Sequence, residues 1–335
     1  MDRRSVLAAA AALLAGCGQQ PSTDTSTPTG TATRTPTATS SPSPTETPTA
    51  SPTETAEPTE TPTASPTETE TPELSEREER AAQALDRAIS ELSQAVSTYV
   101  GNAGDSLVDV SAATENFSRT AVLNDLSDAD DDIEDARRLV SNRQEPRLEA
   151  VETARRFLRL CLDTQPRLIA AYSEAERARD AVESQRETEV EGATADLRAE
   201  RQDAEAGFDS IESETDAERV SVVPAIPAGD YEAKVAQFGA EVDGFGSLAD
   251  FFDRFRPAIV DLNDAERFDR AERERRARED GQAAADAFDA LATDLRTFAN
   301  DLTEAGVALR PLAADLADIA ETKAEDAREL VEDNS

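Results

Sequence analysis

From residue 75 to the end of the chain, apolar residues recur every three or four positions. This spacing returns to one face of an α-helix at each turn, whereas a half-buried β-strand requires alternation, of which the sequence offers no convincing stretch. Charged residues flank each apolar stripe, as they do where helices pack along a common seam. The sequence therefore predicts an all-α fold, an elongated helical bundle or antiparallel coiled coil.

Turn-forming residues divide this helical part of the chain. Ser75 and Glu78 have the capping-box spacing that marks a helix start. The segment 222–229, which contains two prolines and a glycine, is the clearest later break. We therefore expect a first helical half at 74–218, a linker at 219–229 and a second helical half at 230–333.

The apolar stripes predict the helices within each half. Two of them stay in phase across a helix breaker: one across Pro166, and one past Gly306 and Pro311, where the chain could turn. The stripes run over residues 85–99, 122–140, 151–182 with a weaker continuation to about 214, 231–262 and 284–319.

The amino-acid composition removes most catalytic and metal chemistry. The 335 residues include no His, no Trp and two Cys, Cys17 and Cys161. Without imidazole, neither a Ser-His-Asp triad nor a His-ligated metal can be built, and two cysteines are too few for an iron–sulfur cluster. A formal net charge of −37 would repel the phosphate backbone of a nucleic acid. We therefore expect no enzyme activity, no cofactor, no metal and no nucleic-acid partner.

The negative charge is accompanied by a near absence of lysine. The chain has 71 Asp and Glu against 34 Lys and Arg, and its only lysines are Lys234 and Lys323. This composition resembles that of proteins from salt-loving archaea, because a dense carboxylate surface is tolerable where salt screens its self-repulsion. An acidic, disordered chain that works at low salt is the alternative.

Salt adaptation makes a testable prediction. The Debye length grows from about 3 Å at 1 M salt to about 10 Å at 0.1 M, so repulsion between neighbouring carboxylates strengthens as salt is removed. The helix content should therefore fall when salt is lowered from about 3 M to about 0.1 M. Far-UV circular dichroism measures this content, and an unchanged spectrum would contradict salt adaptation.

The N-terminus has the features of an export signal followed by a lipid anchor. Arg3 and Arg4 precede an apolar run that is too short to span a bilayer, and residues 14–17 read Leu-Ala-Gly-Cys. The first motif resembles the twin-arginine signal and the second a lipobox, as in exported lipoproteins of halophilic archaea. The resemblance implies a signal peptide at 1–16, a lipid on Cys17 and a location on the extracellular face of the cytoplasmic membrane.

Cys17 is followed by a low-complexity segment. Residues 18–73 consist almost entirely of Thr, Pro, Ser, Glu and Ala, and the sequence of 44–55 recurs unchanged at 58–69. Without apolar periodicity, nothing offsets the entropy of ordering such a chain. We therefore expect 17–73 to be a lipidated cysteine followed by a disordered stalk, similar to O-glycosylated stalks.

Two charged runs are candidate binding sites. Residues 128–135 hold six carboxylates, but a calcium loop of the EF-hand type needs glycine at its sixth position, which is Ile133 here. We interpret this run as a solvated acidic face, with loose cation binding as the alternative. Residues 266–280 interleave six Arg with six acids. We interpret them as a solvated helical stretch with pairs four residues apart, and an arginine dock for an acidic partner is the alternative; the pairs are Glu266–Arg270, Glu272–Arg276 and Glu274–Arg278.

Three further features have both a structural and a functional reading. Cys161 lies on an apolar stripe and is predicted to be a buried small residue. The phenylalanines between 238 and 255 could floor an apolar ligand pocket, although at helical spacing they are predicted to be core. Asn116 begins the one Asn-X-Ser/Thr sequon and is a candidate N-glycosylation site, while Ser118 is equally suited to cap the next helix.

Together these features predict a non-enzymatic surface lipoprotein whose helical part is an interaction or spacer module of the cell envelope. The expected partners are the membrane, through the lipid on Cys17, and either another protein or a second copy bound through the coiled-coil seams. A surface receptor for a solute or an apolar ligand is the alternative function.

Overall fold

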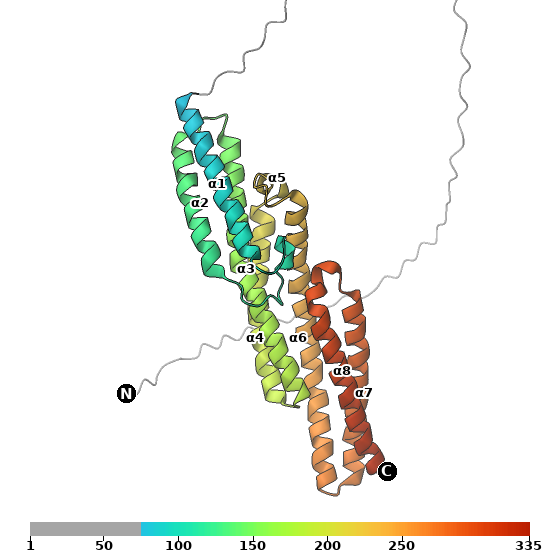
Figure 1. Ribbon diagram of the computed structural model, residues 1–335. Coiled ribbons are helices and arrows are strands. Elements are labelled where there is room, and N and C mark those ends of the chain that lie inside the picture. The colour runs from blue at the N-terminus through green and yellow to red at the C-terminus, as the bar shows by residue number, and fades with distance from the viewer. Residues whose placement is uncertain (1–74) are drawn as a thin grey trace, which may run out of the picture. The chain divides into compact units, whose positions relative to one another are not determined.

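In the computed structural model, which describes residues 75–335, α-helices are joined by short connections (Figure 1). No strand occurs in that part of the chain, so the prediction of an all-α helical bundle is confirmed. The α-helices are α1 (Glu76–Val100), α2 (Arg119–Leu139), α3 (Glu145–Glu183), α4 (Glu187–Glu214), α5 (Ala217–Val220), α6 (Ala228–Arg270), α7 (Glu274–Asp301) and α8 (Arg310–Asp333). The 3₁₀-helices η1 (Leu107–Asp109) and η2 (Glu304–Leu309) lie in the α1–α2 and α7–α8 connections.

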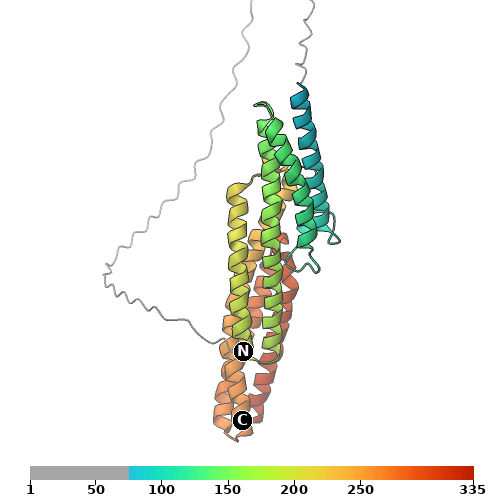
Figure 2. The ribbon, with the colours of Figure 1, turned by 90° about the vertical axis from the view of Figure 1, so that its left-hand side faces the viewer.

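Helices that follow one another in the chain pack side by side, in the pairs α1–α2, α3–α4, α6–α7 and α7–α8 (Figures 1 and 2). The 43-residue α6 joins these hairpins, because it packs on α3 and α4 as well as on α7 and also contacts η1 and η2. One hydrophobic cluster runs through the described helices. None of those helices combines the length and the apolar character needed to cross a bilayer.

The first helix begins where the capping-box motif predicts. The Ser75 hydroxyl accepts a hydrogen bond from the Glu78 amide at 3.3 Å, and the Glu78 carboxylate accepts one from the Ser75 amide at 2.9 Å. The Arg77 guanidinium donates to the carbonyl oxygens of Leu139 and Arg138 at the end of α2, at 3.1 and 2.9 Å. The start of α1 is therefore tied to the end of α2.

The continuation of the third stripe to about residue 214 hides a chain reversal. Residues 184–186 separate α3 from α4, which then runs back along α3. Gln185 has a positive φ of 57°, and the amides of Gln185 and Arg186 donate to the carbonyls of Val182 and Ala181. This is the Schellman ending, which glycine or asparagine normally supplies. Because glutamine gives no such signal, the stripe does not reveal the turn.

Glycine should suit this turn better than glutamine. Gln185→Gly is expected to raise the free energy of unfolding by about 1 kcal/mol, because a left-handed backbone strains residues that have a Cβ. The matched control is Gln202→Gly, in the exposed interior of α4, which should lose about 1 kcal/mol. Urea unfolding measures both changes, and a loss of stability in both variants would contradict the strain argument.

The segment 219–229, predicted as a linker, is packed against the helices. It contains the end of α5 and the start of α6, and the side chains of Val220, Val223 and Ile226 are fully buried in the hydrophobic cluster. The last stripe, 284–319, does turn near Gly306: it is divided between α7 and α8, with η2 in the connection.

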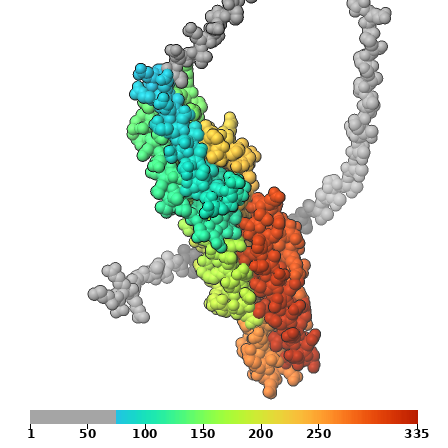
Figure 3. Space-filling model, in the orientation of Figure 1, coloured from blue at the N-terminus to red at the C-terminus, as the bar shows by residue number. Residues whose placement is uncertain are grey.

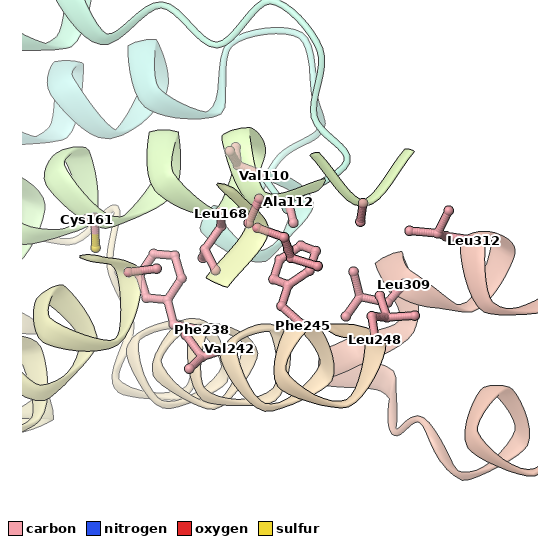
Figure 4. Close-up of a cluster of buried hydrophobic side chains, with 14 of the residues drawn as sticks. Val110, Ala112, Cys161, Leu168, Phe238, Val242, Phe245, Leu248, Leu309 and Leu312 are labelled. Atoms are coloured by element: carbon pink, nitrogen blue, oxygen red, sulfur yellow. The ribbon is translucent and has the colours of Figure 1, made fainter. Parts of the chain in front are cut away.

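The phenylalanines between 238 and 255 are core residues, as their spacing predicts. Four of them are fully buried, and Figure 4 shows Phe238 and Phe245 pointing from α6 into a cluster with Leu168 and Ala112. The only large apolar side chains on the surface of the described helices are Val260 and Val307, which are 39% and 45% exposed. The apolar seams are therefore filled within this part of the chain. The fully buried members of the run are Phe238, Phe245, Phe252 and Phe255.

Candidate functional site

A fully buried lysine, Lys234, lies in the second turn of α6. The Lys234 ammonium donates three hydrogen bonds: to the Val110 carbonyl at 2.5 Å, to Gln165 Oε1 at 2.8 Å and to Gln237 Oε1 at 3.0 Å. These acceptors come from the α1–α2 connection, from α3 and from α6 itself. All three ammonium hydrogens therefore have a partner, which is what keeps a buried charge tolerable.

A buried carboxylate accompanies this lysine two helical turns further along α6. Glu241 Oε1 accepts from the Ala112 amide at 3.0 Å and from Gln237 Nε2 at 3.3 Å. Gln237 also donates to the Val108 carbonyl at 3.1 Å, so its amide links the lysine, the carboxylate and the α1–α2 connection. We call Lys234, Gln237, Glu241 and Gln165 the buried polar cluster.

Aromatic rings complete the surroundings of the ammonium group. Lys234 Nζ lies 4.4 Å from the centroid of the Phe238 ring and 5.6 Å from that of Tyr99, within the range of cation–π attraction. The Tyr99 hydroxyl donates to Gln165 Oε1 at 2.9 Å. The cluster thus holds the end of α1 and the α1–α2 connection against α3 and α6.

Burial shifts the titration of the groups in this cluster. Loss of solvation, only partly offset by the Lys234 charge, raises the pKa of Glu241 to about 7, and the same loss lowers the pKa of Lys234 to about 8. Burial also raises the pKa of Cys161 to about 12 and that of Tyr99 well above its usual range. Within the described residues, Glu241 Oε2 and Gln165 Nε2 lack a hydrogen-bond partner. The cluster therefore contains two ionisable groups that are costly to keep charged.

The geometry suits a structural tie better than a reactive site. A lysine that forms a Schiff base or acts as a base must reach substrate, but Lys234 is fully buried and its three donors are occupied. Cys161 is buried, as its stripe predicts, and forms no disulfide within residues 75–335; its raised pKa keeps the thiol protonated and unreactive.

A surface hollow of about 530 Å³ lies beside the cluster, between the end of α1 and the α1–α2 connection. Its lining includes Tyr99 and Phe117, whose rings meet edge to face with centroids 5.1 Å apart. Asn116, the candidate glycosylation site, is exposed on its rim with a φ of 58°. Ser118 does occupy the N-cap position of α2, but its hydroxyl makes no capping hydrogen bond. Glycosylation of Asn116 stays a prediction.

The acidic run 128–135 lies on α2, where arginines of neighbouring helices neutralise part of it. Arg155 of α3 binds Asp130 at 2.5 Å, and Arg87 of α1 binds Asp132 at 2.8 Å. In the described part of the chain, no group of three or more potential ligands is placed to hold a metal ion. The carboxylates of this run thus help to join α2 to its neighbours.

The arginine-rich run 266–280 is divided by a turn that its charge pattern does not reveal. It spans the end of α6, a connection at 271–273 and the start of α7. Only Glu266–Arg270 among the three predicted pairs forms, at 3.4 Å. The six arginines of this run are exposed, as the interpretation of a solvated stretch has it. The positive φ of 53° at Glu272 reverses the chain, so Glu272 and Arg276 do not share one helix.

The residues of the export signal and the lipid anchor, Arg3, Arg4 and Cys17, lie outside the described residues. The apolar stripes did not predict the buried polar cluster, although the sequence contains a signal for it. Lys234 and Glu241 stand seven residues apart on the α6 seam that Tyr231, Phe238 and Phe245 mark. Comparison of the chain with protein-family models, with curated proteins and with solved structures finds no match.

Proposed function

We propose that this chain is a non-enzymatic, membrane-tethered surface lipoprotein whose helical part is an interaction or spacer module of the cell envelope. The observation that best supports this proposal is the buried polar cluster. Its α6 side chains form hydrogen bonds with the α1–α2 connection and do not line an open site. A clamped, internally filled bundle suits presentation of a fixed surface.

The sequence supports the tether. The Leu-Ala-Gly-Cys motif at 14–17 supplies a thiol for lipid attachment, and the twin arginines at 3 and 4 suit an export route that carries folded proteins. A single acyl chain binds a membrane only marginally, so stable anchoring calls for two chains on this residue. The segment 18–73 would then space the helical part from the bilayer.

Loss of the lipidated thiol should release the protein from the membrane. Cys17→Ser is expected to move the chain from the membrane pellet to the soluble fraction, because the proposed anchor is the lipid on this thiol. Cys161→Ala is the matched control, since it removes the other cysteine and should leave the chain in the pellet. Immunoblotting of fractionated cells measures both, and a Cys17→Ser chain that stays in the pellet would refute the lipid anchor.

The alternative function is a surface receptor for a solute or an apolar ligand. It rests on the hollow of about 530 Å³ at the α1–α2 connection, which offers an aromatic pair beside polar side chains. Mass spectrometry of the full-length chain purified at high salt tests this alternative. A small molecule that copurifies in stoichiometric amount would favour the receptor over the interaction module.

A further inference from the structure

The turn between α6 and α7 gathers arginines around an aromatic ring. The guanidinium carbons of Arg267, Arg273 and Arg276 lie 4.9, 5.8 and 5.4 Å from the centroid of the Phe268 ring. All three distances are shorter than about 6 Å, the limit within which a cation is attracted to the face of an aromatic ring. The three arginines are exposed and the ring is half-buried. We call these four residues the Phe268 cluster.

The arginines of this turn differ from most others in the described helices. Most of the other guanidinium groups in the described helices bind a carboxylate, as Arg198 binds Asp253 at 2.6 Å. Arg273 and Arg276 form no ion pair and no side-chain hydrogen bond with another described residue, whereas Arg267 is paired with Asp264 at 2.9 Å. A guanidinium that rests on a ring keeps its N–H edge free. The ring therefore holds the guanidinium groups of Arg273 and Arg276 in place, and their N–H donors have no side-chain partner among the described residues.

The backbone explains why these side chains converge. The Arg273 amide donates to the Phe268 carbonyl and the Glu272 amide to the Asp269 carbonyl, so α6 ends in a Schellman turn with Glu272 in the left-handed conformation. This reversal returns the start of α7 to the ring at the end of α6. The turn lies at the end of the described helices opposite the start of α1 (Figures 2 and 3).

The charge around the cluster restricts the kind of partner. Guanidinium groups only donate, so a partner must present acceptors to them. Residues 266–280 contain as many acids as arginines, so the patch has no net charge to attract a dense polyanion over a distance. Single, well-spaced carboxylates can still form short-range bidentate hydrogen bonds with the guanidinium groups of Arg273 and Arg276. A polypeptide can present such carboxylates at positions that avoid the acidic residues of the turn.

We propose that the Phe268 cluster is a docking surface for a protein partner that presents spaced carboxylate side chains. The inference deepens the proposed function as an interaction module and rests on it, since it states the chemistry of the partner. The aromatic ring orders these two guanidinium groups before binding, which lowers the entropy lost when a partner docks.

A pair of labelled peptides tests the proposal on the full-length chain. One is an alanine-rich helical peptide with glutamate at every fourth position, and the other carries glutamine instead. Fluorescence anisotropy at high salt should show binding of the glutamate peptide alone. Arg273→Gln and Arg276→Gln should each weaken it at least about fivefold, the equivalent of about 1 kcal/mol. Phe268→Leu should weaken it too, because the guanidinium groups lose the ring that orders them.

Arg143→Gln is the matched control, because Arg143 is also exposed, also lacks an ion pair among the described residues and changes the net charge equally. It should leave binding unchanged. An equal loss in the Arg143 variant, equal binding of both peptides, no binding of either, or equally good competition by tripolyphosphate would each overturn the proposal. None of these outcomes depends on Cys17, so the lipid anchor stands or falls separately.

Discussion

Replacing Lys234 with methionine should lower the free energy of unfolding by about 3–5 kcal/mol, because it leaves one partner of a buried charged cluster without the other. The carbonyl of Val110 and Gln237 Oε1 lose the ammonium donor, and Gln165 Oε1 keeps only the Tyr99 hydroxyl. Glu241 keeps its buried carboxylate but loses the nearby positive charge. Urea unfolding of the full-length chain at constant high salt measures the loss.

The other lysine of the chain provides the control. Lys323 makes one ion pair, with Asp326 of the same helix at 3.5 Å, so Lys323→Met should cost no more than about 1 kcal/mol. The double variant Lys234→Met/Glu241→Leu should recover part of the loss, since apolar residues can replace a buried charged pair. If Lys234→Met lowers the free energy of unfolding no more than Lys323→Met does, the buried polar cluster does not stabilise the packing of the α1–α2 connection on α3 and α6.

Raising the pH through neutrality should destabilise the wild-type chain relative to a Glu241→Gln variant. Burial raises the pKa of Glu241 from its ordinary 4.5 to about 7. Between these values the folded chain retains a proton that the unfolded chain has released, so each rise in pH withdraws stability. The loss is complete above about pH 7 and amounts to roughly 3 kcal/mol at most.

Lys234 should reverse this trend at alkaline pH. Its pKa falls from 10.5 to about 8, so between these values the unfolded chain binds a proton that the folded chain lacks, and stability rises with pH. The contribution of the cluster should therefore be smallest between about pH 7 and 8. Tyr99 and Cys161, which face the same groups from α1 and α3, have raised pKa values, so above about pH 9 they withdraw stability and oppose the effect of Lys234.

Urea unfolding of the wild type and Glu241→Gln over a pH series measures the stability that Glu241 withdraws between about pH 4.5 and 7. The many surface carboxylates titrate alike in both proteins and cancel in the difference, which isolates Glu241. A difference that does not change between pH 5 and 7.5 would show that this carboxylate is not shifted by burial. Lys234→Met should remove the contribution of Lys234 to the rise in stability between about pH 8 and 10.5.

The pattern of apolar residues predicts where helices occur but not where the chain reverses. The capping box at Ser75 predicts the start of α1, and the stripe across Pro166 predicts a long α3, as the structure has it. The turns at Gln185 and Glu272 escape prediction because residues with a Cβ adopt the left-handed conformation there. Tertiary packing imposes that conformation, so no local glycine or proline announces it.

The candidate site was only partly visible in the sequence. Gln165 stands on the predicted stripe of α3, and Lys234 stands on the seam of α6, so both could be placed in the core. Which carbonyls and amides satisfy them could not be predicted, because two of the ammonium's partners lie 69 and 124 residues away in the chain. The Phe268 cluster was hidden similarly, since it exists only once α7 folds back on α6.

The sequence by itself determined the helical class of residues 75–335, the first helix start and the apolar identity of the seams, because each depends on neighbours within a turn or two. Tertiary structure alone decided which groups of other segments satisfy the buried Lys234 and Glu241, and that free arginines would surround one ring. Desolvation and hydrogen bonding act between segments that only folding brings together, so their balance cannot be read from local spacing.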